Sequence, residues 1–424
     1  MWHSLQLQVV TPVFNSAGAQ DTPHLNTPPE IRVPSLRGGM RFWLRAMAAR
    51  YVGDDPHLLR KVENKCLGST ERSSSIAIRI SGNPEPASQD LSTYMSEEEQ
   101  TWIGYLLGQA FTTKGKPHTK AYVPPNREFQ IKIRRQHGDD DAVTCALAAL
   151  WLNITYGGVG ARVRRGFGRL RITDADMTLA GWDSETIRTP HLNHYFEAGH
   201  TGHIGLEGLP HRSVEALHRV CAEARGEDPK EFQLPGHRTK STLSSLGESH
   251  TISGLSAPLS ASGWQEALAR TGKELRYFRA QRDEKHTENA RGPHIKTKGW
   301  KDVILGEGHE MPRAALGLPV GYKDGREVRA FRGPAQNPEQ LRRSSPLWIR
   351  PIVQAEQWHL FSFAFLNEFL PESGGPQGAR VGLFKEGKHK KNITVKNDDI
   401  RTTAKEWTEE LACRADAFSN GRPQ

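Results

Sequence analysis

The order of strand-like and helix-like segments in the first 174 residues constrains the fold of this 424-residue chain more than any other feature. A half-buried strand carries apolar side chains at every second position, whereas a helix that packs on a core carries them every three or four positions. By this criterion the segments follow one another as strand, helix, strand, strand, helix and strand. We expect strands at 5–14, 76–80, 129–134 and 170–172, and helices at 36–51 and 142–155.

This order is the ferredoxin-like arrangement, which RNA-recognition domains also adopt, and it indicates the α+β class. The strands lack the aromatic side chains on which RNA-recognition domains stack bases. Residues 82–128 form a long insertion between strands two and three, with a short helix expected at 96–110. Ser35 and Asp139–Asp141 stand directly before the two predicted helices, where they would cap free N–H groups.

A segment rich in glycine and arginine joins the second predicted helix to the fourth strand. Glycine frees the backbone for positive φ and close approach to a ligand, arginine binds phosphates, and an aromatic ring stacks on bases. We interpret the segment as a site for nucleic acid, with a solvated loop as the alternative. A dinucleotide-binding motif would follow a strand and open a helix, and Val163 stands where its third glycine is required. The expected contacts are Gly157, Gly158, Gly160, Arg162, Arg164, Arg165, Phe167 and Arg169.

Arg37, Arg41 and Arg45 form a stripe along the first predicted helix, beside its apolar face. Residues four apart lie one above the other on a helix, so these like charges repel, and Arg37 in the first turn also opposes the helix dipole. We expect an anionic partner to neutralise them. Two alternatives remain open: the arginines extend their charged ends into solvent, or they pair with carboxylates distant in sequence.

The composition favours a folded, basic protein that binds a polyanion. Lysine and arginine number 57 and aspartate and glutamate 48, which gives a net charge of +9 that is spread among apolar segments. The four cysteines are far apart and form no CxxC motif, which argues against a zinc ribbon or a disulfide framework. Because no signal peptide or membrane-length apolar run is recognisable, we expect a cytoplasmic protein.

Residues 175–424 give weaker signals, which indicate a second α+β domain. Gly, Pro, Ser and Thr are frequent at 226–262, as in a loop or linker. Five histidines contain two HxxH spacings, yet no helix pattern or acidic partner accompanies them, which favours a polar loop over a metal site. These are His191, His194, His200, His203 and His211. We expect helices at 264–282 and 401–418, strands at 347–350 and 358–363, and a lysine-rich hairpin near 385–396.

The motifs indicate binding rather than catalysis. Neither GxxxxGKS/T nor GxSxG occurs in the sequence. The three aspartates at 139–141 could bind a catalytic metal, but their place before a helix favours capping. We therefore expect no catalytic residue, no metal and no cofactor. The alternative is an endoribonuclease with His3 or His24 as general base.

Three motifs in a fixed order give the chain a resemblance to a known family. They are Thr11–Phe14, Pro34–Gly38 running on to Ala46, and Gly157–Gly168. With them the chain resembles the RAMP superfamily of CRISPR systems, and within it the first Cmr-type subunits of the type III-B effector complex. Trp264–Arg282 and Ser344–Leu347 are similar to that family's second half, with less specificity. Asn15–Ala19 departs from the pattern, because the family more often has a Gly-Gly turn there.

The resemblance implies two ferredoxin-like domains, at 1–174 and 175–424, and a place at one end of a multi-subunit ribonucleoprotein. There the chain would be a non-catalytic subunit that contacts the 3′ part of the guide (CRISPR) RNA and the paired target RNA. Other RAMP subunits would carry the nuclease and nucleotide-cyclising sites. The alternative within the superfamily is an endoribonuclease that processes guide RNA. Mapped onto this sequence, the RNA-contacting set is Arg37, Arg41, Arg45 and the 157–169 segment.

Overall fold

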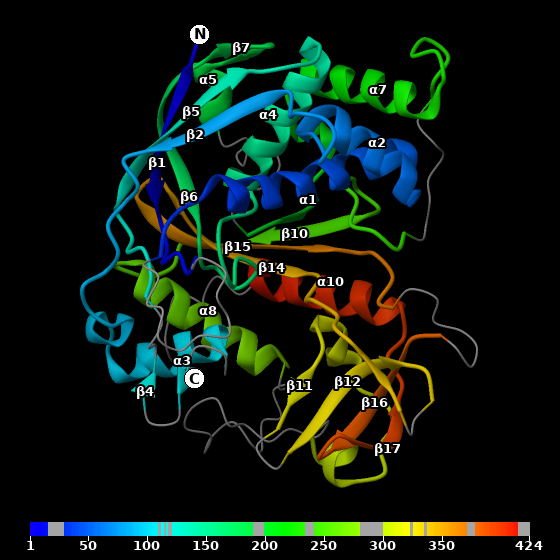
Figure 1. Ribbon diagram of the computed structural model, residues 1–424. Coiled ribbons are helices and arrows are strands. Elements are labelled where there is room, and N and C mark those ends of the chain that lie inside the picture. The colour runs from blue at the N-terminus through cyan, green and yellow to red at the C-terminus, as the bar shows by residue number, and fades with distance from the viewer. Residues whose placement is uncertain are drawn as a thin grey trace.

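A computed structural model defines an α+β protein in which helices pack on three larger sheets (Figure 1). The residues that the structure describes are 1–15, 29–108, 112–113, 116–117, 121–189, 199–233, 241–279, 300–322, 325–334, 337–370 and 378–413. We refer to residues 1–174 as the first half and to residues 175–424 as the second half. Within the described ranges, no helix combines the length and the apolar character needed to cross a membrane.

The first sheet contains the four strands predicted in the first half. Its order is β2-β5-β1-β6, and every neighbouring pair is antiparallel. Alternate side chains of β1 are buried and those between them are half-buried, as the period-two pattern predicts. β1 ends at Val9, shortly before Pro12, near which the sequence predicted the strand to stop because proline cannot donate to the ladder. The strands are β1 (His3–Val9), β2 (Ile76–Ser81), β5 (Glu128–Arg135) and β6 (Leu170–Asp176).

Helices α1 and α4 cover one face of this sheet, and α2 and α7 pack against them (Figure 1). The prediction that Ser35 caps the first helix is wrong. The helix begins three residues earlier, at Val33, with Pro34 in its first turn, and the Ser35 hydroxyl donates to Asn15 Oδ1 at 3.1 Å. The predicted cap of the second helix is confirmed at Asp139. The bounds are α1 (Val33–Val52), α2 (Pro56–Leu67), α4 (Asp140–Thr155) and α7 (His211–Arg225).

The long insertion after β2 carries the predicted helix α3 (Glu97–Leu107), which begins with a capping box between Ser96 and Glu99. α3 packs against α8 (Trp264–Arg279) of the second half. The two helices approach closely, because a Cβ on Gly272 would lie 2.2 Å from the main-chain oxygen of Trp102. The insertion therefore joins the first half to the second.

The second sheet has the order β14-β15-β10-β9 and lies between two helical layers (Figure 1). On one face Trp348 stacks on Phe363 and meets Trp43 of α1, with ring centroids 5.5 and 5.8 Å apart. On the other face Trp407 of α10 donates to the Ser362 hydroxyl at 2.7 Å. The bounds are β9 (Thr201–Gly202), β10 (Thr251–Leu255), β14 (Leu347–Gln354), β15 (Gln357–Phe365) and α10 (Asp398–Cys413).

Two separate stretches of the chain build the third sheet. One stretch lies between α8 and β14, the other lies between β15 and α10, and they join where β12 pairs with β16. The lysine-rich hairpin predicted near 385–396 is confirmed as β16 and β17. The strands are β11 (Val320–Gly321), β12 (Arg326–Arg332), β13 (Glu339–Leu341), β16 (Arg380–Lys385) and β17 (Lys388–Ile393).

Short elements connect these layers. The short strands are β3 (Thr112–Thr113), β4 (Lys116–Pro117), β7 (Thr178–Leu179) and β8 (Trp182–Asp183). The short helices are α5 (Ser184–Arg188), η1 (Leu91–Tyr94), η3 (Leu206–Gly208), η4 (Trp300–Leu305) and η5 (Pro312–Leu316).

Candidate nucleic-acid interface

The glycine–arginine segment folds back on itself and on the end of the first strand. The N–H of Ala161 donates to the oxygen of Phe14, and the N–H of Val159 donates to the oxygen of Gly168, both at 2.8 Å. A Cβ on Gly168 would lie 2.0 Å from the oxygen of Val159. These glycines therefore allow the chain to approach itself closely. Three of them have positive φ: Gly160 (89°), Gly166 (89°) and Gly168 (68°).

Gly157 and Gly158 are buried. A Cβ on Gly157 would lie 2.5 Å from Asn153 Oδ1 and 2.6 Å from Trp43 Nε1. Gly39 of α1 packs on the same amide, since a Cβ there would lie 2.1 Å from Asn153 Oδ1. The second and third sequence motifs thus meet at Asn153, and the burial of Gly157 and Gly158 does not allow the ligand contact predicted for them.

The same segment is joined to β14 of the second half. The N–H of Ile349 donates to the oxygen of Arg164 at 3.2 Å, and Arg164 Nη1 donates to the oxygen of Ser345 at 2.6 Å. In the opposite direction, Arg350 donates to the oxygen of Gly157, and its side chain is buried. The segment is therefore the seam between the two halves.

Arg164 and Arg169 form hydrogen bonds across this seam. Arg169 donates to the main-chain oxygen of Pro351. Burial, with a smaller effect of Arg171, lowers the pKa of Arg169 to about 9. Burial also lowers the pKa of Arg164 to about 10, and its guanidinium carbon lies 5.0 Å from the ring centroid of Trp348. The phosphate contacts predicted for these two arginines are replaced by contacts with carbonyl oxygens of the second half.

The stacking role predicted for Phe167 is wrong. Its side chain is 1% exposed and packs edge-on against Phe14, with ring centroids 5.6 Å apart. Both rings belong to the hydrophobic cluster that also contains Leu268 of α8. Phe167 therefore belongs to the core beneath the segment.

Glu63 of α2 neutralises two of the helix-one arginines. It accepts hydrogen bonds from Arg41 and Arg45, the latter at 2.5 Å. Arg37 donates to the main-chain oxygen of Ile76 at 3.3 Å, and burial, followed by the charge of Arg41, lowers its pKa. Pairing with a distant carboxylate, one of the two alternatives to an anionic ligand, is thus observed for Arg41 and Arg45.

The two sets of arginines have different partners around α1. The glycine–arginine segment meets this helix at Trp43, which lies against Gly157, and at Phe42, whose ring centroid is 5.8 Å from the guanidinium carbon of Arg164. Arg41 and Arg45 pair instead with Glu63 of α2. The single groove lined by both sets, which the sequence suggested, stays a prediction.

A different group of arginines gathers where the segment meets the last turn of α8. Burial and then the charge of Arg279 lower the pKa of Arg165 to about 10. Burial also lowers the pKa of Arg276, whose guanidinium carbon lies 5.9 Å from the ring centroid of Tyr105 in α3. An anion would relieve this repulsion between like charges. We call the following four half-buried residues the junction cluster: Arg162, Arg165, Arg276 and Arg279.

Sequence reasoning identified only the loop members of this cluster. Arg276 and Arg279 lie three positions apart at the end of a helix, so they share one side of it. Two arginines in a last turn also suit the helix dipole, which is the ordinary explanation for their position. Their position next to Arg165 depends on a contact between α8 and a loop more than a hundred residues away, which no local pattern indicates.

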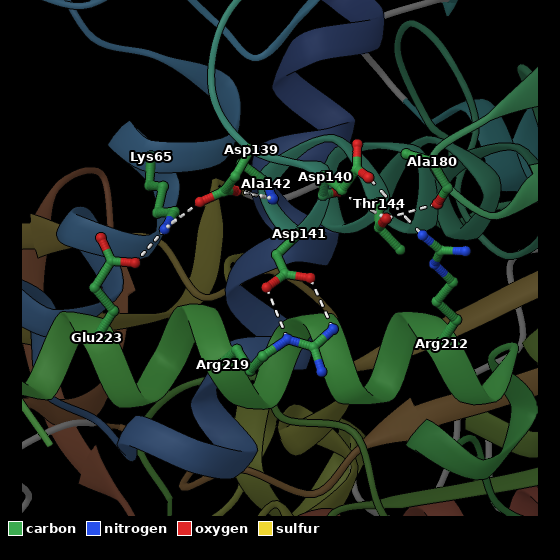
Figure 2. Close-up of polar contacts among 10 residues, drawn as sticks. All are labelled: Lys65, Asp139, Asp140, Asp141, Ala142, Thr144, Ala180, Arg212, Arg219 and Glu223. Carbon is green, nitrogen blue, oxygen red and sulfur yellow. Dashed lines mark hydrogen bonds and ion pairs between the residues drawn. The ribbon is translucent and has the colours of Figure 1, made fainter. Parts of the chain in front are cut away.

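The aspartates before α4 are matched by cations, as Figure 2 shows. Asp139 accepts the N–H of Ala142 at 2.8 Å and pairs with Lys65 at 2.9 Å. Asp141 accepts two hydrogen bonds of 2.8 Å from Arg219 of α7. The capping interpretation is therefore confirmed for Asp139.

The candidate histidines have ordinary surroundings where the structure describes them. His3 is 9% exposed, and its Nδ1 lies 3.3 Å from the N–H of Thr178. His203 pairs with Glu207 at 2.5 Å. No group of three metal-binding side chains occurs in the described ranges. His24, His191 and His194 lie outside the described residues.

Comparisons with known proteins agree on one family. The family model of the RAMP superfamily matches residues 6–171. The CRISPR system Cmr subunit Cmr1-1 of Pyrococcus furiosus is 31% identical over 151 residues, which are 36% of this chain and 43% of that protein. Cmr1-2 of the same organism is 28% identical over 181 residues, which are 39% of this chain and 92% of that protein. The match thus spans less than half the length of Cmr1-1.

The similarity of fold extends over both halves. The crystal structure of Cmr1 from Pyrococcus furiosus in its apo form aligns with 95% of this chain and 97% of that chain, at a TM-score of 0.50. The sequence identity in this alignment is 18%, so the alignment concerns the fold alone.

Proposed function

We propose that the chain, which matches the RAMP superfamily over residues 6–171 and resembles Cmr1, is a non-catalytic RNA-binding subunit of a CRISPR type III-B (Cmr) ribonucleoprotein. In this role it lies at one end of the complex in the cytoplasm. It contacts the 3′ region of the guide RNA, the paired target RNA and neighbouring RAMP subunits. The names of the two relatives, which are Cmr subunits of CRISPR systems, support the assignment to such a complex.

The proposed domain organisation is two ferredoxin-like domains, at 1–174 and 175–424. In the first, the order β1-α1-β2-β5-α4-β6 and the sheet order β2-β5-β1-β6 support this assignment. In the second, β10, α8, β14, β15 and α10 follow the same order, and β9 takes the place of the last strand. The α3 region and the third sheet are then insertions. α7 lies in the second half by sequence, although it packs on helices of the first.

The observation that carries the RNA-binding role is the junction cluster. Its guanidiniums come from the glycine–arginine segment and from α8, so they can hold a phosphate backbone at the seam between the halves. Burial makes each contact with an anion stronger than it would be in water. Arg45, whose side chain is 46% exposed, is the member of the helix-one set best placed to add a contact. Base pairing between guide and target RNA recognises the sequence, so these residues need to bind only the RNA backbone and recognise its shape.

The salt dependence of RNA binding tests this proposal. Each lost phosphate contact should reduce the slope of log K against log salt by about 0.7 for single strands. We expect Arg165→Gln and Arg279→Gln each to weaken binding of the full chain to labelled single-stranded RNA and to reduce this slope. The matched control is Arg60→Gln on the exposed side of α2, which should change neither quantity. Unchanged slopes for both junction variants would rule out the cluster as the RNA site.

A cleavage assay distinguishes a binding subunit from an endoribonuclease. Guide RNA containing the repeat sequence is incubated with the protein in EDTA and examined on a denaturing gel. We expect intact RNA, because His3 is held in the core next to Thr178. Cuts at one position that disappear in a His3→Ala or a His24→Ala variant would overturn the non-catalytic assignment.

A further inference from the structure

The first sheet has one face covered by helices and one open face. α1 and α4 cover the side of Leu5, Leu7 and Val9, which are fully buried. On the opposite side, Arg79, Lys132 and Arg134 are exposed. Figure 1 shows α1, α2 and α4 together on one side of β1, β2, β5 and β6. The open face is therefore available to a ligand or partner.

Trp2 and three cations form a patch at one corner of this face. The guanidinium carbons of Arg79 and Arg134 each lie 4.8 Å from the centroid of the Trp2 ring. Lys132 is the direct neighbour of Arg79 across the β2–β5 pair. We call Trp2, Arg79, Lys132 and Arg134 the sheet patch.

Within the described part of the chain, no ion pair joins Arg79, Lys132 or Arg134 to a carboxylate. The acidic residues of the open face are Asp174 and Asp176 on β6 and Glu128 at the start of β5, which accepts a hydrogen bond from Gln6 Nε2 at 3.5 Å. By contrast Arg135, the next residue of β5, projects to the helical side and pairs with Asp140. The open face is thus basic at the corner of Arg79, Lys132 and Arg134, whereas Glu128 and Arg171 oppose each other across Gln8 at its other end. A polyanion is attracted to the sheet patch.

The chemistry of the sheet patch fits single-stranded RNA better than an acidic protein. An indole held beside planar guanidiniums offers stacked surfaces for bases, and Lys132 and the two arginines offer charges for phosphates. Gln6 and Gln130 are neighbours across the β1–β5 pair in the middle of the face, and their amides can donate to and accept from base edges. An acidic helix would use the charges but would have no need of an aromatic ring between them.

The sheet patch and the glycine–arginine segment lie toward opposite ends of β1. β1 has 7 residues, so it spans roughly 23 Å at about 3.3 Å per residue. Trp2 lies at its start, and Phe14, which holds Ala161 of the glycine–arginine segment, lies just beyond its end. We propose that RNA held at the junction cluster continues across the open sheet face and stacks on Trp2. This inference rests on the proposed RNA-binding function.

Binding of oligouridylates of graded length to the full chain tests the proposal. Short oligomers should occupy only the junction cluster, whereas longer ones should also reach the sheet patch. The affinity of the unaltered protein should therefore rise in two steps as the oligomer is lengthened. Trp2→Ala should remove the second step and weaken long RNA roughly 5-fold to 150-fold, the range for loss of one stacked base. The double variant Arg79→Gln, Arg134→Gln should do the same without altering an aromatic residue. Tyr94→Ala, at an aromatic residue that is 47% exposed on η1, is the matched control and should change nothing.

The outcomes separate this proposal from the function on which it rests. If the sheet-patch variants fold, as judged by circular dichroism, and bind long RNA like the unaltered protein while Arg165→Gln weakens both lengths, the RNA path is wrong and the proposed function stands. If Arg165→Gln also has no effect, the proposed function fails first. If the sheet-patch variants keep full RNA affinity but no longer assemble with another subunit, the face is a protein-docking surface and the proposal is overturned.

Discussion

Arg350 of β14 donates a hydrogen bond to the main-chain oxygen of Gly157, which lies 193 positions earlier in the chain. The same guanidinium reaches the oxygen of Ile154 at 3.3 Å, at the end of α4. The last carbonyl groups of a helix have no partner within the helix, and a cation beside them also favours the helix dipole. The second half thereby completes a helix of the first.

Arg350→Met should lower the free energy of unfolding by about 1 to 3 kcal/mol, because buried carbonyl oxygens lose their donor. Urea denaturation followed by far-ultraviolet circular dichroism measures the change. The control is Arg342→Met, which removes the same charge from an exposed side chain and should cost less than about 0.5 kcal/mol. Equal losses in the two variants would show that Arg350 acts through its general charge and not through these bonds.

Two adjacent glycines of α1 should respond to alanine in opposite ways. A Cβ on Gly38 meets nothing within 4 Å, so Gly38→Ala should raise stability by about 0.5 to 1 kcal/mol through the better helix propensity of alanine. A Cβ on Gly39 would lie 2.1 Å from Asn153 Oδ1, so Gly39→Ala should lower stability by about 1 to 3 kcal/mol. Thermal unfolding of both variants is the measurement. If the two changes had the same sign, the contact with Asn153 would be excluded as the reason for glycine.

Removing the carboxylate of Glu63 tests the helix-one arginines. Glu63→Gln leaves Arg41 and Arg45 without their counter-charge, so it should lower stability and, at low salt, strengthen RNA binding several-fold. Glu71→Gln changes the net charge by the same amount at an exposed position after α2 and serves as the control. Filter binding at two salt concentrations provides the comparison. Identical RNA affinities for the two variants would exclude Arg41 and Arg45 as RNA contacts.

The cap of α4 should make stability depend on pH. Burial alone would raise the pKa of Asp139, but the N–H of Ala142 and the ammonium of Lys65 outweigh it, so the pKa lies below its ordinary value. A lowered carboxyl pKa means a contribution that is complete above the unfolded-state pKa of about 4 and is lost as the pH falls below it. Asp139→Asn keeps a capping oxygen without the charge. We expect the stability difference between the two proteins to shrink on acidification, as measured by urea unfolding at several pH values, whereas parallel curves would refute this role.

Substitution of Phe167 should lower the stability of the fold and leave RNA binding unchanged. Because its side chain is 1% exposed, Phe167→Ala should lower the free energy of unfolding by about 3 to 5 kcal/mol. At a temperature where the variant remains folded, its RNA affinity should equal that of the unaltered protein. A variant of normal stability with weakened RNA binding would restore the stacking role that the sequence suggested.

Local patterns predicted what local forces determine. The alternation at 129–134 predicts β5, because one face of that strand is buried and the other is exposed. The charge at Asp139 predicts the start of α4, because a cap acts on residues three positions away. The position of the glycine–arginine segment between helix and strand was also correct, as both neighbours have clear periodicity.

The functions of single side chains depend on contacts that the sequence does not encode locally. Arg41 meets Glu63 only because α2 folds back on α1, and Arg169 meets Pro351 only when the halves join. The same limit applies to Trp2, whose single aromatic ring before a strand carries no periodic signal. Cys66, Cys145 and Cys221 are far apart in sequence, yet all three are buried, and proximity to Cys66 helps to raise the pKa of Cys145.

The pairing of β12 with β16 limits how this protein can be shortened. Each of the two stretches that meet there would, without the other, present an unpaired row of N–H and C=O groups, a surface prone to aggregation. Each of the two stretches therefore needs the other in order to form a paired sheet. A minimal version of the chain must therefore delete both stretches at once.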